Sequence, residues 1–332
     1  MNRRTFISSV LSTILLSYQS RLLALDKKIE FNKTGYISEP LFLDHHISPD
    51  HPEKPDRLKF IQQAMEKSGL LDEISQVSLK PDVGDWLKTL HTDAHIASIM
   101  KNTPGAHKVA EACVRACLAA VDKVATAELD NVFCATRPPG HHALNTGKEE
   151  GFCYYNHVAI AARYAQQQYG LKKILIVDWD YHHGNATETM FYDDPSVLYF
   201  STHDLYAYPG TGDPRKKGSG AGLGYNINVA LPCGTNDKMI VDVFQNILLP
   251  AAEKYKPDLV LVSAGFDSRE HDLLGCFDIT DVAYKAMTKT VMQIADKHAE
   301  GRLISVLEGG YNLKGISEAV VTHVSTLLGK VN

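Results

Sequence analysis

The chain is built from short apolar runs that alternate with longer amphipathic stretches. Runs rich in β-branched residues occupy residues 132–135, 173–178, 196–201, 259–263 and 303–307. Several are continuously apolar, which is typical of parallel strands covered on both faces. Helical periodicity occupies roughly residues 106–128, 156–169, 237–254, 281–298 and 313–328. This alternation predicts an α/β fold with a single doubly wound, mostly parallel β-sheet flanked by helices.

Composition and net charge limit the classes of function that the protein can have. The chain has 332 residues, of which 44% are hydrophobic, so it contains enough apolar side chains for a substantial core. Its formal net charge of −5 gives no electrostatic footprint for DNA, RNA or an anionic membrane surface. We therefore expect no nucleic-acid partner.

The first residues have the pattern of a leader. Arg3 and Arg4 precede an apolar stretch at residues 7–16 that is too short to span a bilayer. Ala24 offers a cleavage position. The pattern predicts a twin-arginine signal peptide at residues 1–24 and a bacterial protein that is periplasmic or secreted, with no stable membrane insertion once the leader is removed. The alternative is an uncleaved N-terminal helix on a cytoplasmic protein.

The six cysteines follow no metal-binding spacing. We expect them to be thiols that pack as small hydrophobic side chains.

Polar residues follow the predicted strands, where ligands bind in a doubly wound sheet. Asp178, Asp180 and His182 alternate at one strand end, and Asp267 follows another. Two aspartates and one histidine leave a metal a free position for water, as catalytic zinc requires. The alternative is an ionic network that caps the strand ends. Iron(II) or cobalt could occupy the same set of ligands.

Two further strand ends carry groups suited to proton transfer. His141 and His142 follow a rigid Pro-Pro-Gly turn, and imidazoles near a metal predict a general base with an electrostatic helper. Tyr311 follows two glycines, so its hydroxyl is predicted to donate to an oxyanion that develops on a substrate carbonyl.

These segments together resemble the histone deacetylase family, nearest its second class and the bacterial amidohydrolases grouped with it. The family has the arginase/deacetylase-like fold. The matching segments are residues 137–143, 151–153, 178–185, 208–212, 262–267 and 307–311, with a weaker match at 51–57. The resemblance implies that residues 29–332 form a zinc-dependent deacetylase domain with one Zn²⁺ on Asp180, His182 and Asp267.

The resemblance also assigns roles around the metal. It implies that His142 is the general base, that His141 is its electrostatic companion, and that Asp178 and Asn185 support these two histidines. It implies a structural K⁺ ion beneath the zinc. The residues near that ion would be Asp178, Ser201 and Thr202.

The substrate would lie in a narrow tunnel. The resemblance implies that Phe152 and Tyr208 form its walls and that the Gly151 carbonyl receives the substrate amide hydrogen. Residues 94–106 contain no acidic residue, whereas many protein deacetylases have a rim aspartate there. Leu274 stands where polyamine-selective relatives often have an acidic gatekeeper.

The predicted function is therefore hydrolysis of the acetyl amide of acetyl-lysine-like substrates to an amine and acetate. Acetylated lysine, a peptide or a polyamine would be the substrate. The nearest alternative is an acetylpolyamine or other small-molecule amidohydrolase with the same site. An arginase-like ureohydrolase would need a second metal. A metal-containing protein that binds acyl groups without hydrolysing them is the alternative outside enzymes.

Overall fold

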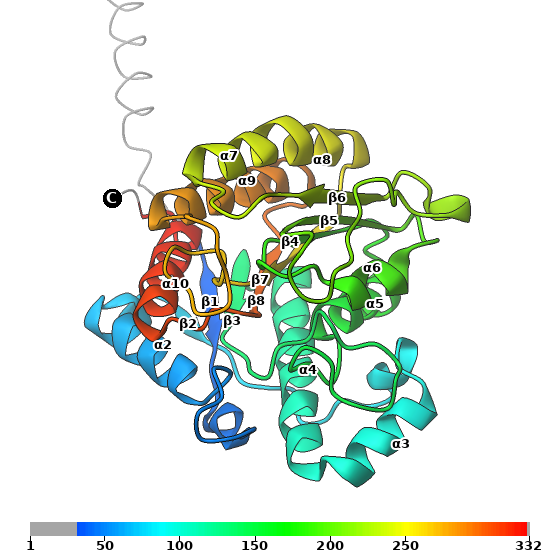
Figure 1. Cartoon of the computed structure of the whole chain (residues 1–332), viewed down its shortest axis with the longest axis vertical. Coiled ribbons are helices and arrows are strands. Elements are labelled where there is room, and N and C mark those ends of the chain that lie inside the picture. Colours follow the sequence, from blue (N-terminus) through cyan, green and yellow to red (C-terminus); the bar gives the residue numbers. More distant parts are fainter. Residues whose placement is uncertain (1–31, 331–332) are drawn as a thin grey trace, which may run out of the picture. The chain divides into compact units, whose positions relative to one another are not determined.

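The protein is described here by a computed structural model that covers residues 32–330. Residues 33–330 belong to one compact unit, which is built on an eight-stranded sheet in the order β2-β1-β3-β8-β7-β4-β5-β6 (Figure 1). Every neighbouring pair of strands is parallel. The strands are β1 (Thr34–Ile37), β2 (Ser75–Gln76), β3 (Asn131–Cys134), β4 (Ile174–Asp178), β5 (Val197–His203), β6 (Asn226–Ala230), β7 (Leu259–Ala264) and β8 (Leu303–Leu307).

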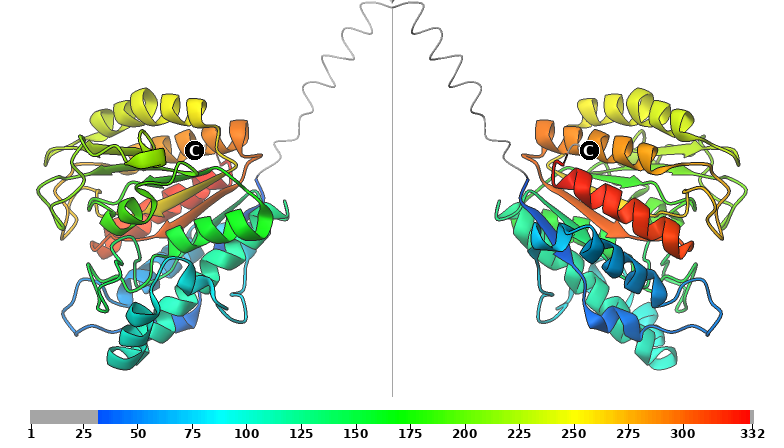
Figure 2. Two further views of the ribbon diagram at one scale, coloured as in Figure 1. Left: turned by 90° about the vertical axis from the view of Figure 1, so that its right-hand side faces the viewer. Right: turned by 90° about the vertical axis from the view of Figure 1, so that its left-hand side faces the viewer.

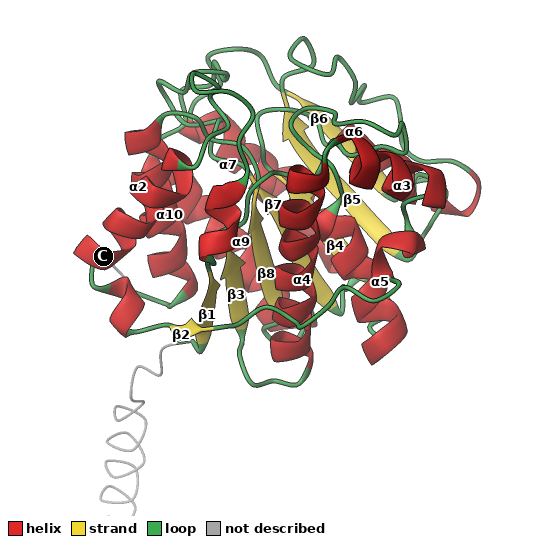
Figure 3. Cartoon of the chain, turned by 90° about the horizontal axis from the view of Figure 1, so that it is seen from below, coloured by secondary structure: helices red, strands yellow, loops and turns green. Residues whose placement is uncertain are grey.

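Helices cover both faces of the sheet (Figures 2 and 3). One layer contains α2, α7, α8, α9 and α10, and the other contains α3, α4, α5 and α6, as their mutual contacts show. The α-helices are α2 (Asp56–Lys67), α3 (Asp93–Asn102), α4 (Pro104–Ala125), α5 (His157–Tyr169), α6 (Asn185–Phe191), α7 (Asp237–Val243), α8 (Leu249–Tyr255), α9 (Asp281–His298) and α10 (Leu313–Leu327). The predicted doubly wound parallel sheet is thus confirmed.

The central strands are fully buried, and their sequences explain why. Strands β4, β7 and β8 have no exposed residue. Their continuous apolar runs suit a sheet with a helical layer on each side. Within residues 32–330, no helix is both long and apolar enough to cross a lipid bilayer.

Local signals place the helix ends close to the predicted positions. The side chain of Asn156 accepts a hydrogen bond from the Ala159 backbone N–H at the start of α5, and Asn312 caps α10 in the same way. Gly170, with a φ of 68°, ends α5 in the left-handed conformation that glycine adopts readily.

The predicted helix over 237–254 differs from the structure. In the structure this segment is divided into α7, one π-helical turn at Phe244–Leu248, and α8. Pro250 lies in the first turn of α8. Proline has no backbone N–H and its ring crowds the preceding turn, so the wider turn accommodates it.

Three strands, β1, β2 and β6, were absent from the sequence prediction. Strand β1 contains a glycine, β2 has only two residues, and β6 alternates asparagines with apolar residues. All three lie toward the edges of the sheet, where short or polar strands are common and the apolar signal is weak.

Candidate active site

A cavity of about 530 Å³ opens beyond the carboxyl ends of β3, β4 and β8. It brings together residues from segments that are distant in the sequence. Its lining consists of Pro139, His141, His142, Glu149, Gly151, Phe152, Tyr181, His182, Ala207, Tyr208, Leu274 and Tyr311. The predicted histidines, tyrosine and tunnel residues therefore share one hollow.

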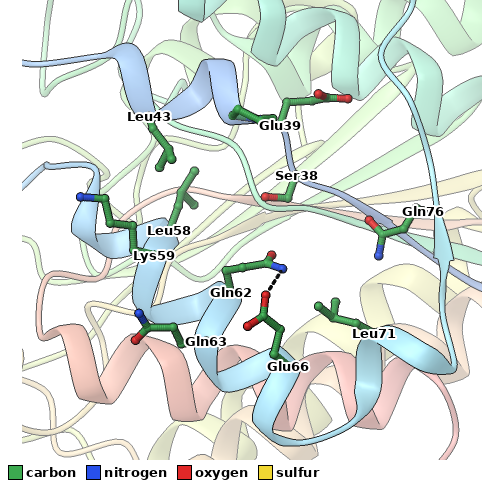
Figure 4. A pocket seen from close by; sticks show the side chains of 11 residues that line it. Ser38, Glu39, Leu43, Leu58, Lys59, Gln62, Gln63, Glu66, Leu71 and Gln76 are labelled. Atoms are coloured by element: carbon green, nitrogen blue, oxygen red, sulfur yellow. Dashed lines mark hydrogen bonds between the residues drawn. The ribbon is translucent and has the colours of Figure 1, made fainter.

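A second hollow of about 640 Å³ lies between α2 and the segments around β1 and β2 (Figure 4). Its side chains are mainly amide and aliphatic, and Gln62 donates a hydrogen bond to Glu66 within it. None of the residues predicted to carry chemistry lines it. The smaller cavity is therefore the candidate active site.

The three predicted metal ligands form one cluster. Ligand atoms of Asp180, His182 and Asp267 all lie within 4.8 Å of one another. The His182 Nδ1 atom is 3.1 Å from an oxygen of Asp180 and 3.0 Å from one of Asp267. Both aspartates are buried, and His182 reaches the cavity.

The backbone fixes the two carboxylates in place. Asp180 accepts a hydrogen bond from the Gly309 N–H at 2.8 Å, and Asp267 accepts one from the Tyr181 N–H at 2.9 Å. A methyl group on Gly265 would lie 2.1 Å from Asp180, and one on Gly309 would lie 2.2 Å from Asp267. These two positions therefore need glycine, because any side chain would displace a carboxylate.

The charges of the cluster suit a divalent cation. Burial, together with the neighbouring charge of Asp180, raises the pKa of Asp267 to about 7, although the His182 ring acts in the opposite direction. Two buried carboxylates this close require a neutralising proton or a metal ion. Two carboxylates and one imidazole are ligand types found at catalytic zinc sites, so this cluster is a candidate site for a divalent metal ion.

Asp178 does not belong to this cluster. Its Oδ2 atom lies 3.1 Å from the His141 Nδ1 and accepts a hydrogen bond from the Tyr199 hydroxyl at 3.0 Å. The three alternating residues therefore have two different roles. One aspartate orients a histidine, and the next two residues of the series face the metal position.

The two cavity histidines have different partners. His141 faces Asp178, whereas the His142 Nδ1 lies 2.8 Å from the amide oxygen of Asn185. Because Asn185 offers an oxygen, the Nδ1 of His142 donates to it, and its Nε2 is left as an acceptor. The rings are 4.0 Å apart between centroids.

Their pKa values diverge accordingly. Burial lowers the pKa of His141, but the charges of Asp178, Asp180 and Glu308 outweigh it and raise the pKa to about 10. Burial holds the pKa of His142 well below its usual range, and the neighbouring His141 lowers it further. At neutral pH the His141 ring is therefore charged and the His142 ring is neutral. The pair combines a positive charge with a base that can accept a proton.

Tyr311 is held by groups that the sequence prediction left without a role. Its backbone N–H donates to Asp272 at 2.7 Å, and the Arg57 guanidinium lies 5.0 Å from its ring centroid. Burial raises the pKa of Tyr311 well above its usual range, so its hydroxyl remains protonated. The hydroxyl is thus available as a donor in the cavity.

A buried ionic network supports the segment that carries Tyr311. Arg57 donates to the carbonyl of Gly310 at 2.7 Å and to that of Glu308 at 2.5 Å. Arg137 forms two hydrogen bonds of 2.7 Å with Glu53, which also lies 3.3 Å from Arg57. Glu53 and Arg57 belong to the weakly matching segment 51–57 and Arg137 to the matching segment 137–143, but neither segment indicated that these residues pair with one another.

Glu308 is a further residue that the prediction missed. Its carboxylate accepts hydrogen bonds from the backbone N–H groups of Gly140, at 2.7 Å, and His141, at 3.2 Å. Burial raises its pKa to about 7. Glu308 lies at the end of a neighbouring strand, and its carboxylate therefore fixes the turn that carries the two histidines.

The predicted tunnel walls surround this centre. The Phe152 ring packs edge-to-face against Tyr311 at 6.1 Å, and Tyr208 packs against His142 at 5.0 Å. Gly151 has a φ of 53°, and an added methyl group would lie 2.3 Å from the His142 ring. Leu274 also lines the cavity and is 39% exposed, which places it toward the mouth.

The residues predicted to surround a monovalent cation are adjacent and buried. Asp178 and Ser201 are paired across β4 and β5, and Thr202 follows on β5. All three are inaccessible to solvent or nearly so.

The prediction that all six cysteines are free thiols is wrong for two of them. Cys233 and Cys276 form a disulfide, with 5.2 Å between their Cα atoms. The other four are buried thiols, as predicted. Residues 43 positions apart in irregular segments carry no spacing signal for a disulfide, so their pairing depends on the fold. The predicted leader, with Arg3, Arg4 and Ala24, lies outside the described residues.

Comparison with known proteins places this geometry in a family. A sequence model described as the histone deacetylase domain matches residues 51–327. The chain belongs to the histone deacetylase family. It is accordingly a hydrolase that acts on amide bonds, and its deacetylase relatives include proteins from archaea, plants and humans.

Among these histone deacetylase relatives is a probable deacetylase of Archaeoglobus fulgidus, 35% identical over 302 residues, covering 85% of this chain and 82% of that protein. Human histone deacetylase 9 is 34% identical, and the match covers 92% of this chain but 35% of the human protein. Histone deacetylase 15 of Arabidopsis thaliana is 36% identical, with coverage of 84% and 53%. The chain thus spans about a third to a half of the human and plant proteins.

A solved structure supports the same assignment. The crystal structure of the HDA15 HD domain superposes with a TM-score of 0.84 at 34% identity, covering 90% of each chain. The arginase/deacetylase-like fold expected from the sequence is confirmed.

Proposed function

We propose that the protein is a zinc-dependent deacetylase that hydrolyses the acetyl amide of acetyl-lysine-like substrates to an amine and acetate. The observation that carries the proposal is the convergence of a three-ligand metal cluster, a charged and a neutral histidine, and a buried tyrosine on one cavity. An acetylpolyamine or other small-molecule amide hydrolysed by the same residues is the second candidate.

Asp180, His182 and Asp267 would hold the zinc. When bound there, it would supply a Lewis acid for the acetyl carbonyl and for a water molecule. The remaining chemistry belongs to side chains of the chain itself.

His142 is neutral at pH 7, so it accepts a proton from the attacking water, with Asn185 holding the ring in the required tautomer. The same proton then passes to the nitrogen of the leaving amine as the amide bond breaks. The positive charge on His141 favours the negative charge that develops on the substrate. Tyr311 donates a hydrogen bond to the carbonyl oxygen while that oxygen becomes an oxyanion.

The first experiment measures hydrolysis of a fluorogenic acetyl-lysine substrate by the purified, zinc-loaded protein. We expect turnover that a chelator abolishes and that His142→Ala lowers by about a hundred- to ten-thousandfold. His46→Ala, an exposed histidine outside the cavity lining, is the matched control and should leave turnover intact.

A second readout concerns the metal alone. Elemental analysis should find one zinc per chain in the wild type and much less in Asp267→Asn. Failure of the loaded protein to hydrolyse acetyl-lysine, acetylpolyamine or any other acetyl amide would contradict the proposal.

We also propose a K⁺ ion near Asp178, Ser201 and Thr202. Its support is the buried carboxylate and hydroxyl oxygens there, which suit a hard cation. If the ion is present, thermal stability should be higher in KCl than in tetramethylammonium chloride at equal ionic strength. Equal midpoints in the two salts would contradict it.

We propose export through the twin-arginine route, on the basis of Arg3 and Arg4 in the sequence. Expression of the full chain in a bacterium, followed by cell fractionation, should place it outside the cytoplasm. Arg3→Lys combined with Arg4→Lys should retain it inside.

A further inference from the structure

The catalytic cavity contains a carboxylate that the proposed reaction does not use. Glu149 is the only acidic residue among those that line the cavity in the described part of the chain. The other lining groups above the histidines are aromatic or aliphatic: Phe152, Tyr208, Ala207 and Leu274. A single negative charge therefore faces an otherwise apolar passage.

Glu149 is fixed in the wall. Its carboxylate accepts a hydrogen bond from the backbone N–H of Phe152. Reciprocal hydrogen bonds between the backbones of Glu150 and Cys153 close the turn that carries both residues. The carboxylate is thus held against the segment whose next residues, Gly151 and Phe152, form the tunnel wall.

Glu149 has no cationic partner in the part of the chain that the structure describes. Glu149 has no ion pair within residues 32–330, and its neighbour Lys148 is exposed and unpaired with it. Glu150 adds a second carboxylate, one oxygen of which is buried without a hydrogen-bond partner. Burial is the main cause of the raised pKa of Tyr208, and the charges of Glu150 and Glu149 raise it further, so their negative potential reaches the tunnel wall.

The mouth offers aromatic faces beside this charge. Phe152 and Tyr208 both line the cavity, and Tyr208 is 50% exposed. A carboxylate combined with aromatic rings is the chemistry that recognises an organic cation, through an ion pair and cation–π attraction. Leu274, by contrast, leaves its part of the mouth uncharged.

We propose that Glu149 is a specificity-determining residue that binds a second, protonated nitrogen on the amine portion of the substrate. This inference rests on the proposed function and names its substrate class: acetylated amines whose alkyl chain ends in an ammonium group. The alkyl chain packs along Phe152, Tyr208 and Leu274, and the ammonium group lies at the carboxylate.

The test uses two substrates that differ only in charge. N-acetyl-1,5-diaminopentane has a terminal ammonium group, and N-hexylacetamide has a methyl group of similar size there. Zinc-loaded wild type should prefer the diamine in kcat/KM, mainly through KM. Glu149→Gln should reduce this preference about tenfold, as expected for a hydrogen bond to a charged group. Its amide oxygen still accepts the hydrogen bond from Phe152.

Glu66→Gln is the matched control. Glu66 is an exposed glutamate on α2 that lines the second hollow and forms no ion pair with any residue between 32 and 330, so its substitution should leave the preference unchanged. Calorimetric binding of the acetylated diamine to metal-depleted protein gives a second readout that is independent of turnover. There too the affinity should fall about tenfold in Glu149→Gln.

The outcomes are distinct. Hydrolysis of both amides with the same preference in wild type and Glu149→Gln would overturn the inference and leave the proposed function intact. Absence of hydrolysis of either amide, and of any other acetyl amide, would overturn both. A preference that weakens with salt in the wild type but not in Glu149→Gln would support the ion pair.

Discussion

The guanidinium of Arg57 lies 5.0 Å from the ring centroid of Tyr311 while it donates to the carbonyl of Gly310, the residue just before that tyrosine. One buried cation thus fixes both the ring and the backbone of the oxyanion donor. Because Arg57 is inaccessible to solvent, we regard it as a positioning residue that acts through Tyr311.

Substitution of Arg57 by methionine should lower both stability and kcat. Removal of one member of a buried ionic network costs about 3 kcal/mol in unfolding free energy, with Glu53 still paired to Arg137. A donor displaced by about 1 Å costs about a hundredfold in rate. Denaturant titration and steady-state kinetics measure the two effects.

Tyr311→Phe is the companion variant because it retains the ring below Arg57. It should lose about a hundred- to a thousandfold in kcat with little change in unfolding free energy. Full kcat in Arg57→Met would show that Tyr311 is positioned without the arginine.

Gly151→Ala should nearly abolish turnover. The added methyl group would lie 2.3 Å from the His142 ring, so the base or the wall must move. We expect a loss of at least about a hundredfold in kcat. Gly170→Ala is a suitable control because Gly170 has a similar φ of 68° but nothing within 4 Å of the added methyl. It should lose about 1 kcal/mol of stability and keep its activity.

The positions of the candidate site residues were readable from the sequence because these residues lie on short contiguous motifs at strand ends. Asp178, Asp180 and His182 occupy one such end, and Asp267 and Tyr311 each follow another strand. Once the strands were recognised as parallel, their carboxyl ends had to share one edge of the sheet. Local pattern and topology together were therefore sufficient to predict these residues.

The residues that hold the site were not readable in the same way. Arg57 contacts Gly310 across 253 positions of sequence, and no periodicity encodes that contact. Glu308 reads as one more polar residue after a strand, although it fixes the turn before the histidines. The disulfide between Cys233 and Cys276 likewise requires knowledge of which loops meet.

That disulfide should be countable in solution. Unfolded, unreduced protein should show four reactive thiols, and reduced protein should show six. A crosslink across 43 residues stabilises the fold by about 4 kcal/mol through the entropy of the unfolded chain. Reduction, or Cys233→Ala, should therefore lower the midpoint of thermal unfolding. Six reactive thiols before reduction would contradict the pairing.

Stability should fall in mild acid because of buried histidines remote from the cavity. Burial lowers the pKa of His323 to about 3, and its ring packs between Phe133 and Trp179. Between pH 6.5 and about 3 the unfolded chain binds a proton that the folded chain does not. Stability is therefore complete above pH 6.5 and decreases as the pH falls through this window.

The measurement is urea unfolding of metal-depleted protein at pH 7 and pH 5. A histidine with this pKa contributes about 2 kcal/mol to the difference between the two pH values. His323→Phe should reduce the difference by about that amount, whereas His46→Ala, which alters an exposed ring, should not. An unchanged difference in His323→Phe would mean that the buried ring is protonated in the folded state.

Strand β8 lies between β3 and β7 in the sheet although it is the last strand of the chain to be synthesised. Until residues 303–307 leave the ribosome, β3 and β7 lack the strand that pairs with both of them, so their apolar edges have no partner there. Such edges are prone to aggregation, so nascent chains of this protein should depend on chaperones until strand β8 has been synthesised. Catalytic competence is then gained in one late step, when the final strand joins the two halves.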